Sequence, residues 1–267
     1  MMEIARFFPF SLFLFLLSSL LAVAATRAES RYSLFWSRQA YRMGLALALA
    51  IFLGRFLRAD RGPADGFFEG VLLSTALLGL IYAMMPLFFK IELEAGFFSG
   101  VSFVLGLVAV FKADFSPAAR PFEGDLTSHA AFMFLALAAF SLSFIFSLLF
   151  LIEDYLLKRK RIDLFFFRLP PLELISRLNF SFLTVGTASL LGGVLAGIYD
   201  LRRFDTGSVS LPAPTLALSV LTLALYGAVL FIRIGPLERR RGTAYVSIAS
   251  YTCLLVTFLA AHAGAGI

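Results

Sequence analysis

Eight long apolar runs divide this chain of 267 residues, and they constrain its fold more than any other feature. The hydrocarbon core of a bilayer is about 30 Å thick, so a spanning helix needs roughly 20 mainly apolar residues. A bilayer offers no water to exposed peptide groups, which forces such runs to be helical. The runs cover residues 7–25, 40–57, 71–89, 95–111, 129–152, 179–199, 214–234 and 245–265.

Composition supports the same interpretation. Hydrophobic residues make up 60% of the chain and charged residues 15%, whereas soluble domains are about 45–50% apolar. We therefore predict an all-α, polytopic membrane helix bundle of about eight transmembrane helices, embedded in the lipid bilayer of the cell (inner or plasma) membrane as a multi-pass protein. No linker is long enough to separate domains, so we predict a single integral membrane domain over 1–267.

The positions of Lys and Arg orient the bundle. The first run ends near Ala22-Val23-Ala24 and could be a cleaved secretory signal. If it is retained with the N-terminus outside, 15 of the 23 basic residues are cytoplasmic, including the cluster Lys158–Arg161. Cleavage would place that cluster outside, against the positive-inside rule. We therefore predict a retained first helix and an N-out/C-out topology. Because the basic residues cluster in membrane loops, the net charge of +6 does not indicate a nucleic-acid partner.

Two local patterns predict packing. Gly96 and Gly100, and again Gly193 and Gly197, are four residues apart and share a helix face, where another backbone can approach closely. We interpret both pairs as packing surfaces rather than ligand sites. The segment 169–178 has apolar residues at spacings of three, which is compatible with a short helix on the inner membrane surface or with a plain connector.

Several kinds of chemistry are disfavoured. No Asp or Glu lies inside any of the eight runs, which argues against proton or sodium coupling through intramembrane carboxylates. The one cysteine, Cys253, allows neither a disulfide framework nor thiol exchange within the chain. No phosphate-binding loop, zinc-protease motif or catalytic triad is recognisable. We therefore expect no enzymatic activity.

The two histidines of the chain are its candidate ligands. In the predicted topology His129 opens the fifth run and His262 closes the eighth, both on the outer side. Two imidazoles at matching depth could supply both axial ligands of a haem iron. Each could equally be an interfacial residue bonded to backbone or water. Zinc fits less well, because it needs three or four protein ligands, and these would have to include loop carboxylates such as Asp125, Asp200 and Asp205.

A family resemblance adds to this reading of the residues. It involves the span led by His129, the acidic–basic stretch Glu153–Arg161, the element Leu169-Pro170-Pro171-Leu172-Glu173 leading to Arg177-Leu178, and the glycine-bearing helix Gly186–Gly197. In these features residues 129–264 resemble the cytochrome c assembly family of haem-handling membrane proteins, closest to its CcsA- and HemX-like branch.

The resemblance implies that the chain binds haem, or helps deliver it, at the outer face. His129 and His262 match the positions of the family's haem-ligating histidines, and other cytochrome c assembly membrane proteins are candidate partners. Family members carry a tryptophan-rich W-x-W-D type (WWD) segment after the sixth span, whereas the loop 200–214 has no tryptophan, which favours an accessory role. Arg202 and Arg203 in this loop could pair with haem propionates or be solvated charges.

Two functions without haem stay open at this point. The first is a small-solute permease, which the glycine-bearing helix faces and the outer arginines permit. The second is a scaffold subunit of a membrane complex, a role that a polytopic bundle of this size can have.

Overall fold

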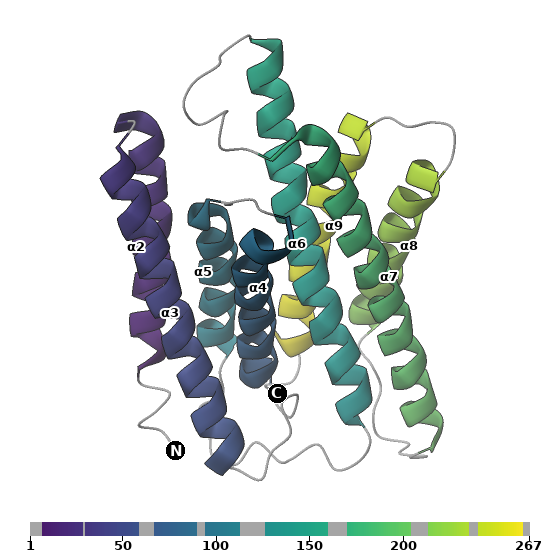
Figure 1. The fold of residues 1–267 in the computed structure, drawn as a ribbon. Helices are drawn as coiled ribbons and strands as arrows, with labels where there is room; N and C mark the ends of the chain where they lie inside the picture. Colours follow the sequence, from purple (N-terminus) through teal and green to yellow (C-terminus); the bar gives the residue numbers. More distant parts are fainter. Residues whose placement is uncertain are drawn as a thin grey trace. The chain divides into compact units, whose positions relative to one another are not determined.

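The computed structural model describes residues 7–28, 30–58, 67–89, 94–112, 126–159, 170–203, 213–234 and 240–263 (Figure 1). Over this part of the chain it contains eight α-helices and no β-strand, which confirms the predicted all-α fold. Each apolar run corresponds to one helix. The helices are α2 (Phe8–Ala28), α3 (Arg31–Arg58), α4 (Phe67–Phe89), α5 (Ala95–Lys112), α6 (Leu126–Lys158), α7 (Leu172–Arg203), α8 (Ala213–Ile234) and α9 (Arg240–Ala263).

Four of these helices contain a segment that is long and apolar enough, within the described residues, to cross a membrane. The segments are Phe8–Ala25 of α2, Gly70–Leu87 of α4, Ser128–Lys158 of α6 and Leu172–Tyr199 of α7. Shorter apolar stretches occupy α5 and α8. The architecture is therefore that of a helical membrane bundle, while the full set of eight spans and the N-out/C-out orientation stay predictions.

The described part of the segment 169–178, from Pro170 onward, is neither a separate surface helix nor a connector, and Leu169 lies outside the described residues. Pro170 and Pro171 precede α7, which begins at Leu172 and continues to Arg203. Prolines cost little at this place, since the first amides of a helix have no intrahelical partner. Ile175 and Leu178 are buried. The apolar face that suggested a membrane-surface helix therefore packs into the protein.

The helices group into two compact units. Unit 1 comprises Met1–Pro121 and Glu153–Pro171, and so holds α2 to α5 with the last turns of α6. Unit 2 comprises Phe122–Ile152 and Leu172–Ile267, and so holds the rest of α6 with α7, α8 and α9. Unit 2 contains most of the segment 129–264 that carries the family resemblance. The single domain over 1–267 stays a prediction.

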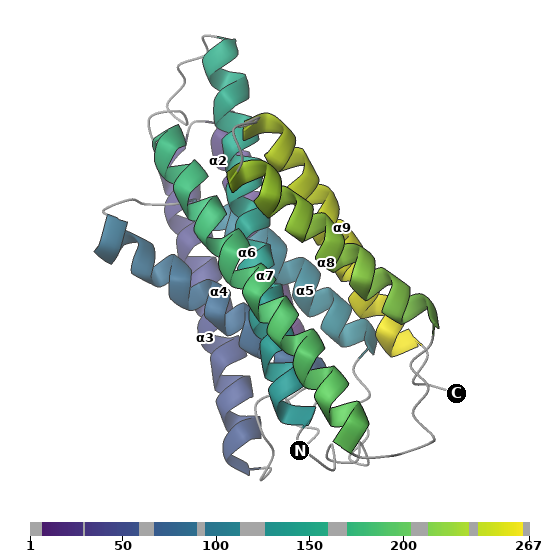
Figure 2. The same cartoon turned by 90° about the vertical axis from the view of Figure 1, so that its right-hand side faces the viewer.

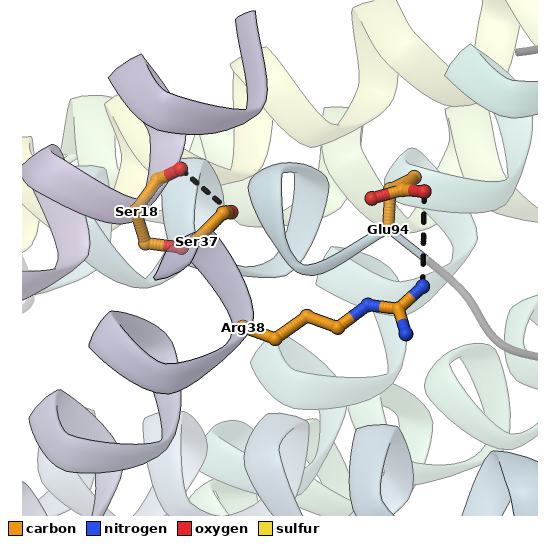
Figure 3. Close-up of polar contacts among 4 residues, drawn as sticks. All are labelled: Ser18, Ser37, Arg38 and Glu94. Carbon is orange, nitrogen blue, oxygen red and sulfur yellow. Dashed lines mark hydrogen bonds and ion pairs between the residues drawn. The ribbon is translucent and has the colours of Figure 1, made fainter. Parts of the chain in front are cut away.

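Hydroxyl groups tie α2 to its neighbours in unit 1. The Oγ of Ser37 on α3 donates to the carbonyl oxygen of Ser18 on α2 at 2.8 Å, and the two Oγ atoms lie 3.3 Å apart (Figure 3). On the side of α5, the Oγ atoms of Ser19 and Ser99 lie 2.9 Å apart. Such bonds satisfy polar groups inside a bundle and hold helix backbones close together.

Gly96 and Gly100 of α5 face helix α2. A Cβ atom on Gly96 would collide with Ala22, whereas one on Gly100 would meet the Oγ of Ser19 at an ordinary 3.5 Å. Glycine at position 96 is therefore what lets the two helices approach. The interpretation of Gly96 and Gly100 as a packing surface is confirmed.

An ion pair joins α3 to the start of α5. Nη2 of Arg38 lies 3.8 Å from Oε1 of Glu94, the residue that precedes α5 (Figure 3). The Glu94 side chain is only 4% exposed and that of Arg38 is 24% exposed. A carboxylate buried to this degree requires a cationic or hydrogen-bonding partner to stay charged. Arg38 thereby links two helices at one end of unit 1.

Candidate functional site

His129 lies in the first turn of α6 and is held by the backbone of α7. Its Nδ1 is 2.6 Å from the carbonyl oxygen of Gly193. A carbonyl oxygen can only accept, so Nδ1 carries the proton and donates it. The proton-free nitrogen of the neutral ring is then Nε2, which keeps its lone pair. Metal-ligating histidines commonly have this arrangement, in which one ring nitrogen bonds to a carbonyl and the other is left to coordinate.

Glycines make this contact possible. A Cβ atom on Gly197 would lie 2.8 Å from Nδ1 of His129, and one on Gly193 would lie 2.9 Å from the sulfur of Met133, one turn further along α6. Larger residues would push α7 away from the imidazole. The interpretation of Gly193 and Gly197 as a packing surface is confirmed, and the surface they meet includes the candidate ligand itself.

A second polar contact joins α6 and α7. The Oγ of Ser143 donates to Oδ1 of Asn179 at 2.6 Å, and Nδ2 of Asn179 donates to the Oγ of Ser147 at 2.9 Å. All three residues are buried. The sequence prediction missed them, although an asparagine near the start of an apolar run, facing two serines four residues apart, is a recognisable signal of a polar contact between helices.

Helix α6 also contacts the other two helices of unit 2. The Oγ of Ser141 lies 2.8 Å from the hydroxyl of Tyr251 on α9. The ring of Phe140 stacks on that of Tyr226 on α8, with centroids 3.5 Å apart. Helices α8 and α9 lie side by side (Figure 2) and are linked by Thr222 and Cys253, whose Oγ1 and Sγ are 3.5 Å apart. His129 therefore projects from the helix that contacts every other helix of its unit.

The remaining predicted site residues lie at helix ends. His262 is in the last turn of α9, and Arg202 and Arg203 end α7. Figure 1 shows that the beginning of α6 and the ends of α7 and α9 point toward the same end of unit 2. The side chains of these three residues lie outside the described part of the structure, so the convergence of the two imidazoles stays a prediction.

The loop carboxylates named as zinc ligands add nothing to the described site. Asp125 and Asp205 lie outside the described residues, as does the side chain of Asp200. Within the described part of the chain, no three His, Cys, Asp or Glu residues form a group that could hold a metal ion. Among the described residues, the candidate site consists of the His129 imidazole, oriented by the backbone of α7.

Comparison with known proteins bears on this site. The chain is similar to the protein HemX of Brevibacillus brevis. The two are 27% identical over 223 residues, which are 80% of this chain and 79% of that protein. The alignment is longer than the segment 129–264, so the likeness reaches into the first four helices, beyond the region in which the sequence resembled the family. No protein-family model matches the chain, and no solved structure matches it.

Proposed function

We propose that this chain is a haem-binding membrane protein of the cytochrome c assembly type, with His129 and His262 as axial ligands near the outer face. The observation that carries the proposal is the 2.6 Å bond between Nδ1 of His129 and the Gly193 carbonyl. It fixes the tautomer of the ring and leaves Nε2 to bind iron. The likeness to HemX supports placing the chain among haem-handling membrane proteins.

The residues of the chain suit this role chemically. The carbonyl bond makes the imidazole more electron-rich and limits its rotation, and both effects favour coordination. Arg202 and Arg203 end α7, the helix that also supplies the Gly193 carbonyl, and guanidinium groups can pair with propionates. When bound, haem would supply an iron porphyrin to be held or passed on, and we propose no enzymatic step on this chain.

The proposed role is accessory. The family's tryptophan-rich segment presents haem after the sixth span, and this chain has a single tryptophan, Trp36, which lies exposed on α3. We therefore propose that the chain binds haem or helps deliver it in the cell membrane, and that other assembly proteins complete the attachment to apocytochrome.

Haem titration of the purified protein in detergent tests the function. We expect a Soret band and a visible spectrum typical of iron with two nitrogen ligands. His129→Ala should abolish the two-nitrogen spectrum and weaken haem affinity at least tenfold, and the variant that also carries His262→Ala should lose specific haem binding. Thr184→Ala is the matched control, because Thr184 is exposed on α7 and its hydroxyl donates to the carbonyl of Phe180 in the same helix. A wild-type protein that gives no specific spectrum would reject haem binding and favour a permease or scaffold.

A further inference from the structure

The polar contact around Asn179 lies far along α6 from the histidine. Asn179 is 3% exposed, and its partners Ser143 and Ser147 are 1% and 0% exposed. Ser143 is fourteen residues after His129 on α6, or about 21 Å at 1.5 Å per residue. Asn179 therefore has no direct contact with the candidate ligand, and any influence on it has to pass along the two helices.

The contacts between α6 and α7 follow one antiparallel register. Three pairs of facing residues recur at steps of seven residues on both helices, which is two helical turns. The pairs are Ser147 with Asn179, Phe140 with Gly186, and Met133 with Gly193. The last pair lies beside the Gly193 carbonyl that accepts from His129.

A seven-residue repeat leaves the register ambiguous as long as its contacts are apolar. If α7 slipped by one repeat along α6, Gly186 would face Met133 and still meet a large apolar side chain. Asn179 would then face Phe140, and its buried amide would lose both serine partners. An unpaired amide in an apolar interior is costly, and a single buried asparagine fixes the register of other helix pairs for this reason.

We propose that Asn179 is a positioning residue that fixes the register of α7 on α6, and with it the place of the Gly193 carbonyl against His129. The register is a property of the fold and does not depend on haem binding. If α7 slips, Nδ1 of His129 loses its acceptor. The effect of this loss on haem binding rests on the proposed function.

Disulfide cross-linking in membranes tests the register without haem. In a Cys253→Ser background, the pair Met133→Cys and Gly193→Cys reports the observed register, because a Cβ atom on Gly193 lies 2.9 Å from the Met133 sulfur. The pair Met133→Cys and Gly186→Cys reports a slip of one repeat. We expect Asn179→Leu to lower the yield of the first cross-link at least threefold and to raise that of the second.

The matched control is Ser181→Leu. Ser181 is exposed on the same helix and donates to the carbonyl of Arg177, also on α7, so this variant should keep the wild-type cross-links. If Asn179→Leu alone does not fold, the variant that also carries Ser143→Ala and Ser147→Ala removes the former serine partners as well, and the same cross-linking test is applied to it. Wild-type cross-links in the Asn179→Leu proteins would overturn the proposal.

Haem titration then separates the register from the function. We expect Asn179→Leu to raise the dissociation constant for haem about tenfold, and Asn179→Gln, which retains the amide, to recover at least half of that loss. If the cross-links shift while the wild-type protein binds no haem, the register proposal is supported and the haem function fails. If the cross-links shift and haem affinity is unchanged, Asn179 does not position His129.

Discussion

At the scale of single residues, the imidazole of His129 is held by the backbone of α7. The acceptor of its proton is the carbonyl of Gly193, and the space beside the ring exists because residue 197 is glycine. A side-chain partner could titrate or rotate, whereas a helix carbonyl is fixed by the helix. The orientation of this ring therefore depends on how closely α7 approaches α6.

Gly197→Ala tests that dependence. The new methyl group would lie 2.8 Å from Nδ1 of His129, so we expect a loss of about 1–3 kcal/mol in stability, the usual cost of overpacking, and weaker haem binding. Gly227→Ala on α8 is the matched control, because a Cβ atom there meets nothing within 4 Å. It should be neutral or stabilising by up to about 1 kcal/mol. Thermal unfolding in detergent measures both, and equal effects would contradict the account.

At the scale of helices, the sequence predicts which glycines form packing faces but not what they face. The spacing of four residues in Gly193 and Gly197 is visible in one helix. Their partners, Met133 and His129, lie 60 and 68 residues earlier, and no local pattern pairs the two helices. Asn179 and the two serines four residues apart on α6 are a recognisable signal of a polar contact, but the sequence does not show that α6 and α7 are neighbours.

Helix α7 begins earlier than predicted, because the apolar spacing within 169–178 indicates a short surface helix separate from the apolar run that follows. No glycine or proline that could end the helix lies between Leu172 and Phe182. Helical spacing therefore continues from Leu172 into the apolar run. The structure shows one helix because hydrogen bonds propagate more easily than they start anew.

The α2–α5 contact in unit 1 offers a helix-level prediction. Gly96→Ala places a methyl group against Ala22 of α2, where neither side chain can rotate away, so we expect a loss of about 1–3 kcal/mol. Gly100→Ala meets only the Ser19 hydroxyl at 3.5 Å and should change stability by less than about 1 kcal/mol. Chemical unfolding followed by fluorescence compares them, and a harmless Gly96→Ala would show that the helices are not in close contact.

The Arg38–Glu94 pair gives a second prediction for unit 1. Removing one partner of a fully buried ion pair costs about 3–5 kcal/mol, and Arg38 is 24% exposed, so we expect Arg38→Ala to cost about 1–3 kcal/mol. Arg42 is exposed one turn further along α3, and Arg42→Ala should stay within about 0.5 kcal/mol. Thermal unfolding of the two variants measures the difference. Indistinguishable stabilities would mean that the pair contributes little.

At the scale of the whole molecule, most of the segment that resembles the family lies in unit 2, while the likeness to HemX extends beyond it. Fold class followed from the apolar runs alone, because only helices satisfy their backbone groups over such lengths in a membrane. The grouping into two units did not follow, since hydrophobicity has no information on which helices contact each other.

Topology is tested on α6, which has a candidate span from Ser128 to Lys158. In a Cys253→Ser background, a membrane-impermeant maleimide should label Ser128→Cys in intact cells and Arg159→Cys only after the cells are opened, as the positive-inside rule requires. Both native residues are exposed, so access to the reagent depends on the side of the membrane. The reverse labelling pattern would invert the predicted orientation.

Chemical rescue of a His129→Gly variant tests the central claim most directly. We predict that this variant, loaded with haem, loses the spectrum of iron with two nitrogen ligands, and that added imidazole restores it by occupying the place of the missing ring. The same spectrum in His129→Gly without imidazole would show that His129 does not bind the iron.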